Sequence, residues 1–276
     1  MQVDYEAEYN NRARVPEHPQ ILARMAKDAA AYRATASSRK RADLGVSYGR
    51  SPRQILDIFH APAGGSPPLA MFIHGGYWRS LEPAAFSQVA AGLNARGVTV
   101  ALAGYDLCPQ VGIGDIVEQI RQACVTLWRR TGKRILVFGH SAGGHLAATT
   151  LATDWSRLSA PPDLVPAAMA ISGLFDLIPL MSTAMNADFK LDEAEAKRLS
   201  PVLWAPPKGK SLDAVVGGAE SAEFLRQSKL IHETWGRSGV ATRYGAPEGA
   251  NHFTVIEPLA DPESALVDRL LGLVPR

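Results

Sequence analysis

Short apolar runs alternate along this chain with longer stretches in which apolar residues recur at helical spacing. The runs that predict strands lie at 54–60, 69–73, 98–103, 134–138, 167–172, 212–216 and 239–244, and a further strand begins near Val46. The helical stretches between them cover 82–96, 113–130, 222–235 and 262–273. This alternation is typical of a mainly parallel sheet with helices on both faces. We therefore predict a fold of the α/β class.

Two segments depart from the alternation. Residues 1–45 are polar and contain a helical pattern over 19–32, which we expect to cover one end of the sheet or the mouth of a site. Residues 177–211 hold several prolines and two short helical patterns, as expected of an inserted lid. Because no repeat or linker divides the chain, we predict a single domain over 1–276 with these two segments as its N-terminal extension and lid.

Composition and charge restrict the classes of function that the chain can have. The 276 residues are 46% hydrophobic and 20% charged, and the net charge of +2 is too close to neutral to favour a nucleic-acid or membrane-surface partner. No apolar stretch approaches the roughly 18 residues of a membrane span. Cys108 and Cys124 are not spaced as a C-x-x-C pair or as metal ligands, which predicts ordinary thiols in a reducing compartment. We expect a cytoplasmic protein.

One Gly-x-Ser-x-Gly pattern, Gly139 to Gly143, stands between the apolar run 134–138 and a helical stretch. Strand, tight turn and helix are the context of a nucleophile elbow, in which strain holds the serine hydroxyl clear of the sheet. The pattern alone also fits a glycine-rich turn without chemistry. In the catalytic interpretation, Ser141 is the nucleophile.

Two places in the chain are expected to supply the N–H donors of an oxyanion hole. Gly75 and Gly76 follow His74 after an apolar run, and consecutive glycines let backbone N–H groups approach a reacting atom. With the N–H of Ala142 they would hold a developing oxyanion. The alternative interpretation is a flexible turn after a strand.

A serine nucleophile needs a base, and the chain has seven histidines. His252 follows the candidate acids and lies in the loop after the last predicted strand, whereas His232 lies within a predicted helix, so His252 is predicted to be the base. Glu220 is the first carboxylate after the run 212–216 and is the favoured acid; Asp176 and Glu223 are its rivals. This chemistry requires neither a metal ion nor an organic cofactor.

Three aromatic residues fall near the predicted site. Tyr77 and Trp78 follow the two glycines, and Phe175 follows the run 167–172. They could form a wall for an aromatic substrate, or they could pack in the core.

In combination these motifs resemble the α/β-hydrolase fold in its hormone-sensitive-lipase-like branch, and more specifically the kynurenine formamidase (arylformamidase) family. The stretches that carry the resemblance are His74–Trp78, Tyr105–Pro109, Gly139–His145, Ser172–Leu177, Glu220–Ser228 and His252–Phe253. The family usually has Asp where this chain has Glu220. The resemblance implies hydrolysis of N-formyl-L-kynurenine to L-kynurenine and formate.

Other functions stay open. Relatives with the same fold hydrolyse short acyl esters or other amides, so a carboxylesterase or a different amidase is the alternative within the same class. A catalytically inactive hydrolase fold that serves as a binding module is the alternative from a different class. In the enzymatic interpretations the partner is a small-molecule amide or ester, and the sequence gives no indication of oligomeric state.

Overall fold

The structure, a computed structural model, describes residues 3–62 and 65–275. Within these ranges one sheet has the strand order β1-β2-β4-β3-β5-β6-β7-β8. Its strands are β1 (Ala42–Ser47), β2 (Ile55–Phe59), β3 (Leu69–Ile73), β4 (Thr99–Ala103), β5 (Ile135–His140), β6 (Ala167–Ile171), β7 (Ser211–Val215) and β8 (Ala241–Gly245). β2 runs antiparallel to β1 and β4, and every other pair is parallel. The parallel pairs direct the carboxyl ends of β3 to β8 to one edge of the sheet.

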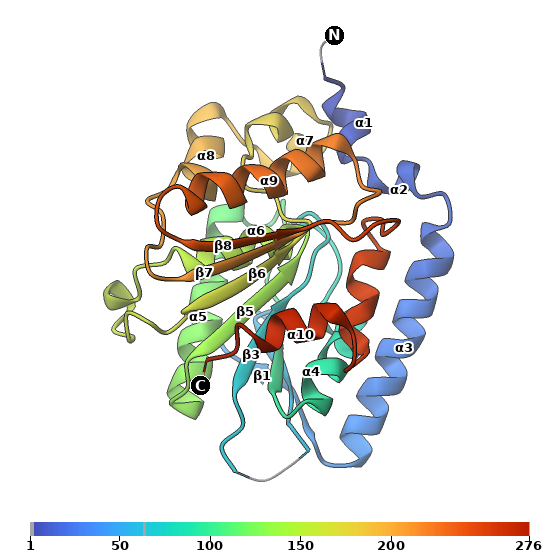
Figure 1. Ribbon diagram of the computed structural model, residues 1–276, viewed down its shortest axis with the longest axis vertical. Coiled ribbons are helices and arrows are strands. Elements are labelled where there is room, and N and C mark those ends of the chain that lie inside the picture. Colours follow the sequence, from blue (N-terminus) through green and yellow to red (C-terminus); the bar gives the residue numbers. More distant parts are fainter. Residues whose placement is uncertain (1–2, 63–64, 276) are drawn as a thin grey trace.

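Helices cover both faces of this sheet (Figure 1). The α-helices are α1 (Tyr5–Tyr9), α2 (Asn11–Arg14), α3 (His18–Ser38), α4 (Ala91–Ala95), α5 (Ile113–Thr131), α6 (Ala142–Leu151), α7 (Asn186–Phe189), α8 (Glu193–Arg198), α9 (Ala222–Gly236) and α10 (Ala265–Leu271). Short 3₁₀-helices lie at η1 (Pro83–Ala90), η2 (Trp155–Leu158), η3 (Ile178–Ser182), η4 (Pro201–Leu203) and η5 (Thr254–Ala260).

The apolar strands are buried on both sides because successive side chains point to opposite faces. In β5, Ile135 and Val137 pack with α5, α6 and α9, whereas Leu136 and Phe138 pack with α3, η1, α4 and α10. The sheet therefore separates two apolar layers, which explains why its central strands read as continuous apolar runs.

Two helices differ from their predicted form. The stretch 82–96 is not one α-helix: it begins as η1 after Glu82 and becomes α-helical only at Ala91. Pro83 opens η1, since its fixed φ and missing N–H suit the start of a helix. The last helix begins at Ala265 rather than near 262, because the Ser264 side chain accepts a hydrogen bond from Val267 N and caps it.

The segments predicted as extension and lid lie together at one end of the sheet. Figure 1 shows α1 beside α9, with α3 running along the outside of the molecule. α1 contacts both α9 and η3, which joins the two segments. The prediction of a single domain over 1–276 stays a prediction; the strands described here all belong to one sheet.

No helix within 3–62 and 65–275 has both the length and the apolar character needed to cross a bilayer.

Candidate active site

The turn between β5 and α6 has the geometry of a strained nucleophile elbow. Ser141 adopts φ 57° and ψ −120°, a conformation that L-residues rarely hold without support. A Cβ atom on Gly139 would lie 2.1 Å from the Gly143 oxygen, and one on Gly143 would lie 2.0 Å from the Ile73 oxygen. Both flanking positions therefore require glycine, and Ser141 N is fixed by a 2.8 Å hydrogen bond to the Ile171 oxygen.

The first of the two glycines after β3 approaches this serine closely. A Cβ atom on Gly75 would lie 2.9 Å from Ser141 Cβ, and Gly76 has φ 104°. Ala142 is the first residue of α6, so its N–H has no partner within the helix. Among the described residues, the N–H groups of Gly75, Gly76 and Ala142 donate to no other group. These three N–H groups are therefore available to a ligand.

The His74 side chain holds the glycine loop through a hydrogen bond to its backbone. Its Nδ1–H donates to the Gly75 oxygen at 2.7 Å, and the Tyr105 hydroxyl donates to the His74 oxygen at 2.8 Å. The two rings stack with centroids 4.3 Å apart. Burial lowers the pKa of His74 to about 4, so the ring is neutral at neutral pH. The sequence alone indicates no role for Tyr105, although Tyr105 begins one of the stretches that carry the family resemblance.

His252, which follows β8, is paired with a carboxylate from the loop after β7. Its Nδ1–H donates to Glu220 Oε2 at 2.6 Å. Glu220 Oε1 accepts from Gly217 N at 2.7 Å and from Ser172 Oγ at 2.5 Å. The Glu220 side chain is fully buried, and each of its oxygens has a donor. This pairing fixes the tautomer of His252, which leaves Nε2 free of a proton.

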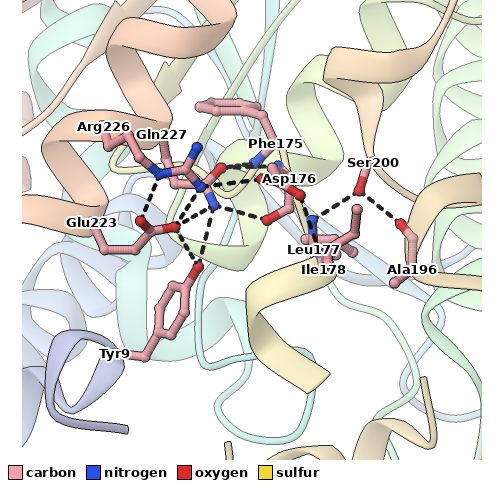
Figure 2. Close-up of polar contacts among 10 residues, drawn as sticks. All are labelled: Tyr9, Phe175, Asp176, Leu177, Ile178, Ala196, Ser200, Glu223, Arg226 and Gln227. Carbon is pink, nitrogen blue, oxygen red and sulfur yellow. Dashed lines mark hydrogen bonds and ion pairs between the residues drawn. The ribbon is translucent and has the colours of Figure 1, made fainter. Parts of the chain in front are cut away.

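The rival acids lie elsewhere. Asp176 accepts from Arg226 and from Ile178 N, and Glu223 accepts from the Tyr9 hydroxyl and from Arg226 (Figure 2). Within the described chain neither carboxylate contacts His252. Of the three candidates, the structure therefore brings Glu220 to the histidine.

A second histidine holds His252 from its backbone. His140, the residue before Ser141, donates from Nε2–H to the His252 oxygen at 2.8 Å. Burial and the neighbouring His252 ring hold the pKa of His140 well below its usual range, so this ring is neutral and can act as a fixed donor. From the sequence, His140 is only a residue that flanks Ser141, because its hydrogen-bond partner is 112 positions away.

One pocket of about 520 Å³ is lined by Ser141, His252 and both glycines of the loop. This volume is in the range of small-molecule sites. No direct hydrogen bond joins Ser141 Oγ to His252 among the described residues. Such contacts commonly tighten only when substrate binds. The extension contributes Tyr9 and Met25 to the lining and the lid contributes Met185, so both segments form walls of the site.

Only one of the three predicted aromatic residues lines this pocket. Tyr77 does, but Trp78 and Phe175 are fully buried in the core, so the prediction for these two is wrong. Trp78 packs edge-on against His145 and Phe189. Consecutive positive φ angles at Tyr77 (50°) and Trp78 (54°) send the two side chains in different directions.

Other apolar residues also line the pocket, although the sequence assigned none of them individually to the site. Leu22 and Met25 belong to the apolar face of α3, Phe86 lies in η1, and Phe253 directly follows His252. For Leu22, Met25 and Phe86 the signal in the sequence is a helical apolar face, which is also what a core helix shows unless the position of the helix is known.

Within the described ranges, no three His, Cys, Asp or Glu side chains are arranged to hold a metal ion.

Comparison with known proteins identifies the family of this chain. Residues 70–255 match the model of a family described as having the alpha/beta hydrolase fold. A kynurenine formamidase from Salmo salar is 33% identical over 241 residues, which are 84% of this chain and 81% of that protein. The chain belongs to the kynurenine formamidase-like α/β-hydrolases. A kynurenine formamidase from Danio rerio is 31% identical, with the same shares covered.

Solved structures agree with the α/β-hydrolase fold. A crystal structure of a putative thioesterase from Silicibacter sp. TM1040 has 34% identity and a TM-score of 0.85, covering 98% of this chain and all of that chain. Esterase B from Lactobacillus rhamnosis, at 17% identity and a TM-score of 0.68, shares the fold over 94% of this chain and 96% of its own. The predicted α/β-hydrolase fold and the predicted family are confirmed. The protein is a hydrolase, and its pocket suits the predicted small-molecule substrate.

Proposed function

We propose that this hydrolase is an arylformamidase that cleaves N-formyl-L-kynurenine or a closely similar aryl formamide. The observation that carries the chemistry is that a strained Ser141 and a Glu220-paired His252 open into one pocket. The support for the substrate is the relatives named as kynurenine formamidases, each matched over most of its length.

The first half of the reaction forms a formyl-enzyme. His252 Nε2 takes the proton of Ser141 Oγ as the oxygen attacks the formyl carbon, and the carbonyl electron pair moves onto its oxygen. The N–H groups of Gly75, Gly76 and Ala142 hold that oxyanion, and one such donor is worth about 2.7–4 kcal/mol. As the carbonyl re-forms, the C–N bond breaks and the leaving aryl amine takes the proton from His252.

The second half releases formate. His252 removes a proton from water, the hydroxyl oxygen attacks the formyl ester, and the Ser141 oxygen leaves and regains its proton. Throughout, Glu220 keeps the His252 tautomer with Nε2 facing the pocket and stabilises the imidazolium that forms twice per cycle.

The lining of the pocket suits an aryl leaving group. Tyr77, Phe86 and Phe253 bring aromatic surface to the same pocket as Ser141. The Tyr77 hydroxyl is occupied in donating to the Tyr9 oxygen at 2.7 Å, which fixes its ring in place. Preplaced rings of this kind pack against an aromatic substrate with little loss of side-chain freedom.

Ester or thioester cleavage is the second candidate. It is favoured by the 34% identical structure described as a putative thioesterase. The same serine, base and oxyanion donors would serve, since only the leaving atom differs.

We also propose that the protein works in a reducing compartment such as the cytoplasm. Cys108 and Cys124 are both buried free thiols, which supports this assignment.

The test is a side-by-side assay of the purified protein on N-formyl-L-kynurenine and p-nitrophenyl acetate, with Ser141→Ala as the blank. We expect kcat/KM for the formamide to be at least as high as for the ester. High ester turnover with negligible formamide hydrolysis would reject the arylformamidase proposal and leave the esterase alternative. Thioester turnover alone would favour the relationship to the putative thioesterase.

A further inference from the structure

The pocket has a wall that the catalytic residues do not explain. Residues 4–15, here called the N-terminal strap, include α1 and α2 and contribute Glu6, Tyr9 and Arg12 to the lining. They lie more than a hundred positions before Ser141 in the chain, yet they line the same pocket.

The strap is held by buried polar contacts. The Tyr9 hydroxyl donates to Glu223 Oε1 at 2.7 Å and accepts from Gln227 Nε2 at 3.2 Å, as Figure 2 shows. The backbone carbonyl oxygen of Tyr9 accepts a hydrogen bond from the Tyr77 hydroxyl at 2.7 Å. Tyr9 is 1% exposed, so these bonds are shielded from water. The strap is thus a built part of the pocket.

The charged side chains of the lining are not equivalent. Arg79 is already paired, with Nη1 2.7 Å from Asp188 Oδ2. Glu6 accepts from Ala184 N at 2.7 Å through Oε2, which leaves Oε1 available. Within the described chain, Arg12 makes no ion pair and no side-chain hydrogen bond. The strap therefore presents a cation without an internal partner to the pocket that holds the nucleophile.

We infer that Arg12 is a specificity residue that binds a carboxylate on the substrate, with Glu6 facing an ammonium group beside it. This inference rests on the proposed function: an aryl formamide that also carries a zwitterionic α-amino-acid group fits both charges. The planar guanidinium matches a carboxylate with two parallel hydrogen bonds. Because the strap holds Arg12 in place, the guanidinium orients the formyl end of the substrate towards Ser141. Binding energy from a group remote from the reacting bond then helps to position that bond for attack.

The test compares two formamides that share the same aryl group. N-formyl-L-kynurenine carries the amino-acid group, and 2′-formamidoacetophenone lacks it. In Arg12→Ala we expect the ratio of kcat/KM values, formylkynurenine over formamidoacetophenone, to fall about 10- to 100-fold, mostly through KM. Arg12→Lys keeps the charge without the fork and is expected to lose less. Glu6→Gln, which keeps an acceptor for Ala184 N, should lower the ratio by a smaller factor.

Arg14→Ala is the matched control. Arg14 lies on the same helix, pairs with Glu8 at 2.6 Å and does not line the pocket. Its loss loosens the strap without removing a pocket charge, so the substrate ratio should stay at the wild-type value.

The outcomes separate the two claims. An unchanged ratio in Arg12→Ala, or an equal fall of both substrates, would overturn the role of Arg12 while the arylformamidase proposal stands. A wild-type protein that hydrolyses p-nitrophenyl acetate but neither formamide would overturn the proposed function, and the inference with it. A ratio that falls as far in Arg14→Ala as in Arg12→Ala would show that strap position, and not the charge of Arg12, sets the preference.

Discussion

Two walls of one pocket are built in different ways. The catalytic wall, formed by the turns after β3, β5, β7 and β8, uses strained or glycine-dependent backbone such as that at Gly75 and Ser141. The substrate wall, formed by the N-terminal strap and the lid, uses side-chain hydrogen bonds such as that of Tyr9 with Glu223. The first wall fixes reacting atoms through the sheet, and the second can change without moving them. Substitutions should therefore affect kcat on one wall and KM on the other.

The largest effect is expected from Glu220→Gln. The amide keeps the size of the side chain but cannot stabilise the imidazolium of His252 or enforce its tautomer. We expect kcat to fall about 10³- to 10⁴-fold with a much smaller change in KM, as steady-state kinetics on N-formyl-L-kynurenine would measure.

Glu223→Gln is the matched control for this variant. Glu223 is also a buried glutamate, only 4% exposed, but its carboxylate serves Tyr9 and the strap. Its substitution should act mainly on KM. A loss of kcat in Glu223→Gln equal to that in Glu220→Gln would contradict the division between the two walls.

A smaller effect concerns acid stability on the catalytic wall. The folded pKa of His74 is lowered to about 4 from a usual value near 6.5. Above pH 6.5 the ring is neutral in both states, so the folded protein has its full stability. As the pH falls from 6.5 towards 4, the unfolded chain takes up a proton that the folded chain does not, and stability is lost. Each such histidine accounts for about 1.4 kcal/mol per pH unit in this window.

Urea unfolding at pH 7 and pH 5 measures this loss. His74→Asn should reduce the difference between the two pH values, whatever its effect on stability at pH 7. His140 and His145 have lowered pKa values for the same reason, burial, and should keep part of the difference. A variant with the same pH difference as the wild type would show that His74 does not contribute.

The smallest effect is expected from Tyr9→Phe on the substrate wall. The variant loses the hydroxyl that bridges Glu223 and Gln227, while Arg226 still pairs with Glu223. We expect a loss of about 1 kcal/mol in stability and a rise in KM for N-formyl-L-kynurenine of severalfold, with kcat nearly unchanged. Thermal unfolding and steady-state kinetics measure both. A fall in kcat without a change in KM would place Tyr9 with the catalytic wall instead.

The two walls also differ in how far the sequence predicts them. The elbow is local: Gly139 and Gly143 stand within two residues of Ser141, and backbone sterics alone demand them. Chain order and strand ends were enough to favour Glu220, which the structure pairs with His252. The catalytic roles of these residues are part of the proposed function, but their meeting in space follows from the order of the strands.

The substrate wall could not be predicted in this way. Tyr9 and Glu223 are 214 positions apart, and no local sequence pattern predicts their contact. The wrong prediction for Trp78 has a related cause, because adjacency to Tyr77 does not determine side-chain direction where φ is positive. In the stretch 82–96, the apolar spacing indicated the buried face but not the 3₁₀ form of Pro83–Ala90.

The central claim is that Ser141 is the nucleophile of the formamidase reaction, and covalent labelling tests it most directly. The protein would be inactivated with a p-nitrophenyl phosphonate ester, which transfers its phosphonyl group to an activated serine, and the adduct located by peptide mass spectrometry. We predict one adduct, on Ser141, formed in proportion to the loss of N-formyl-L-kynurenine hydrolysis. Complete labelling of Ser141 with full retention of formamide hydrolysis, or complete inactivation with the adduct elsewhere, would contradict the account.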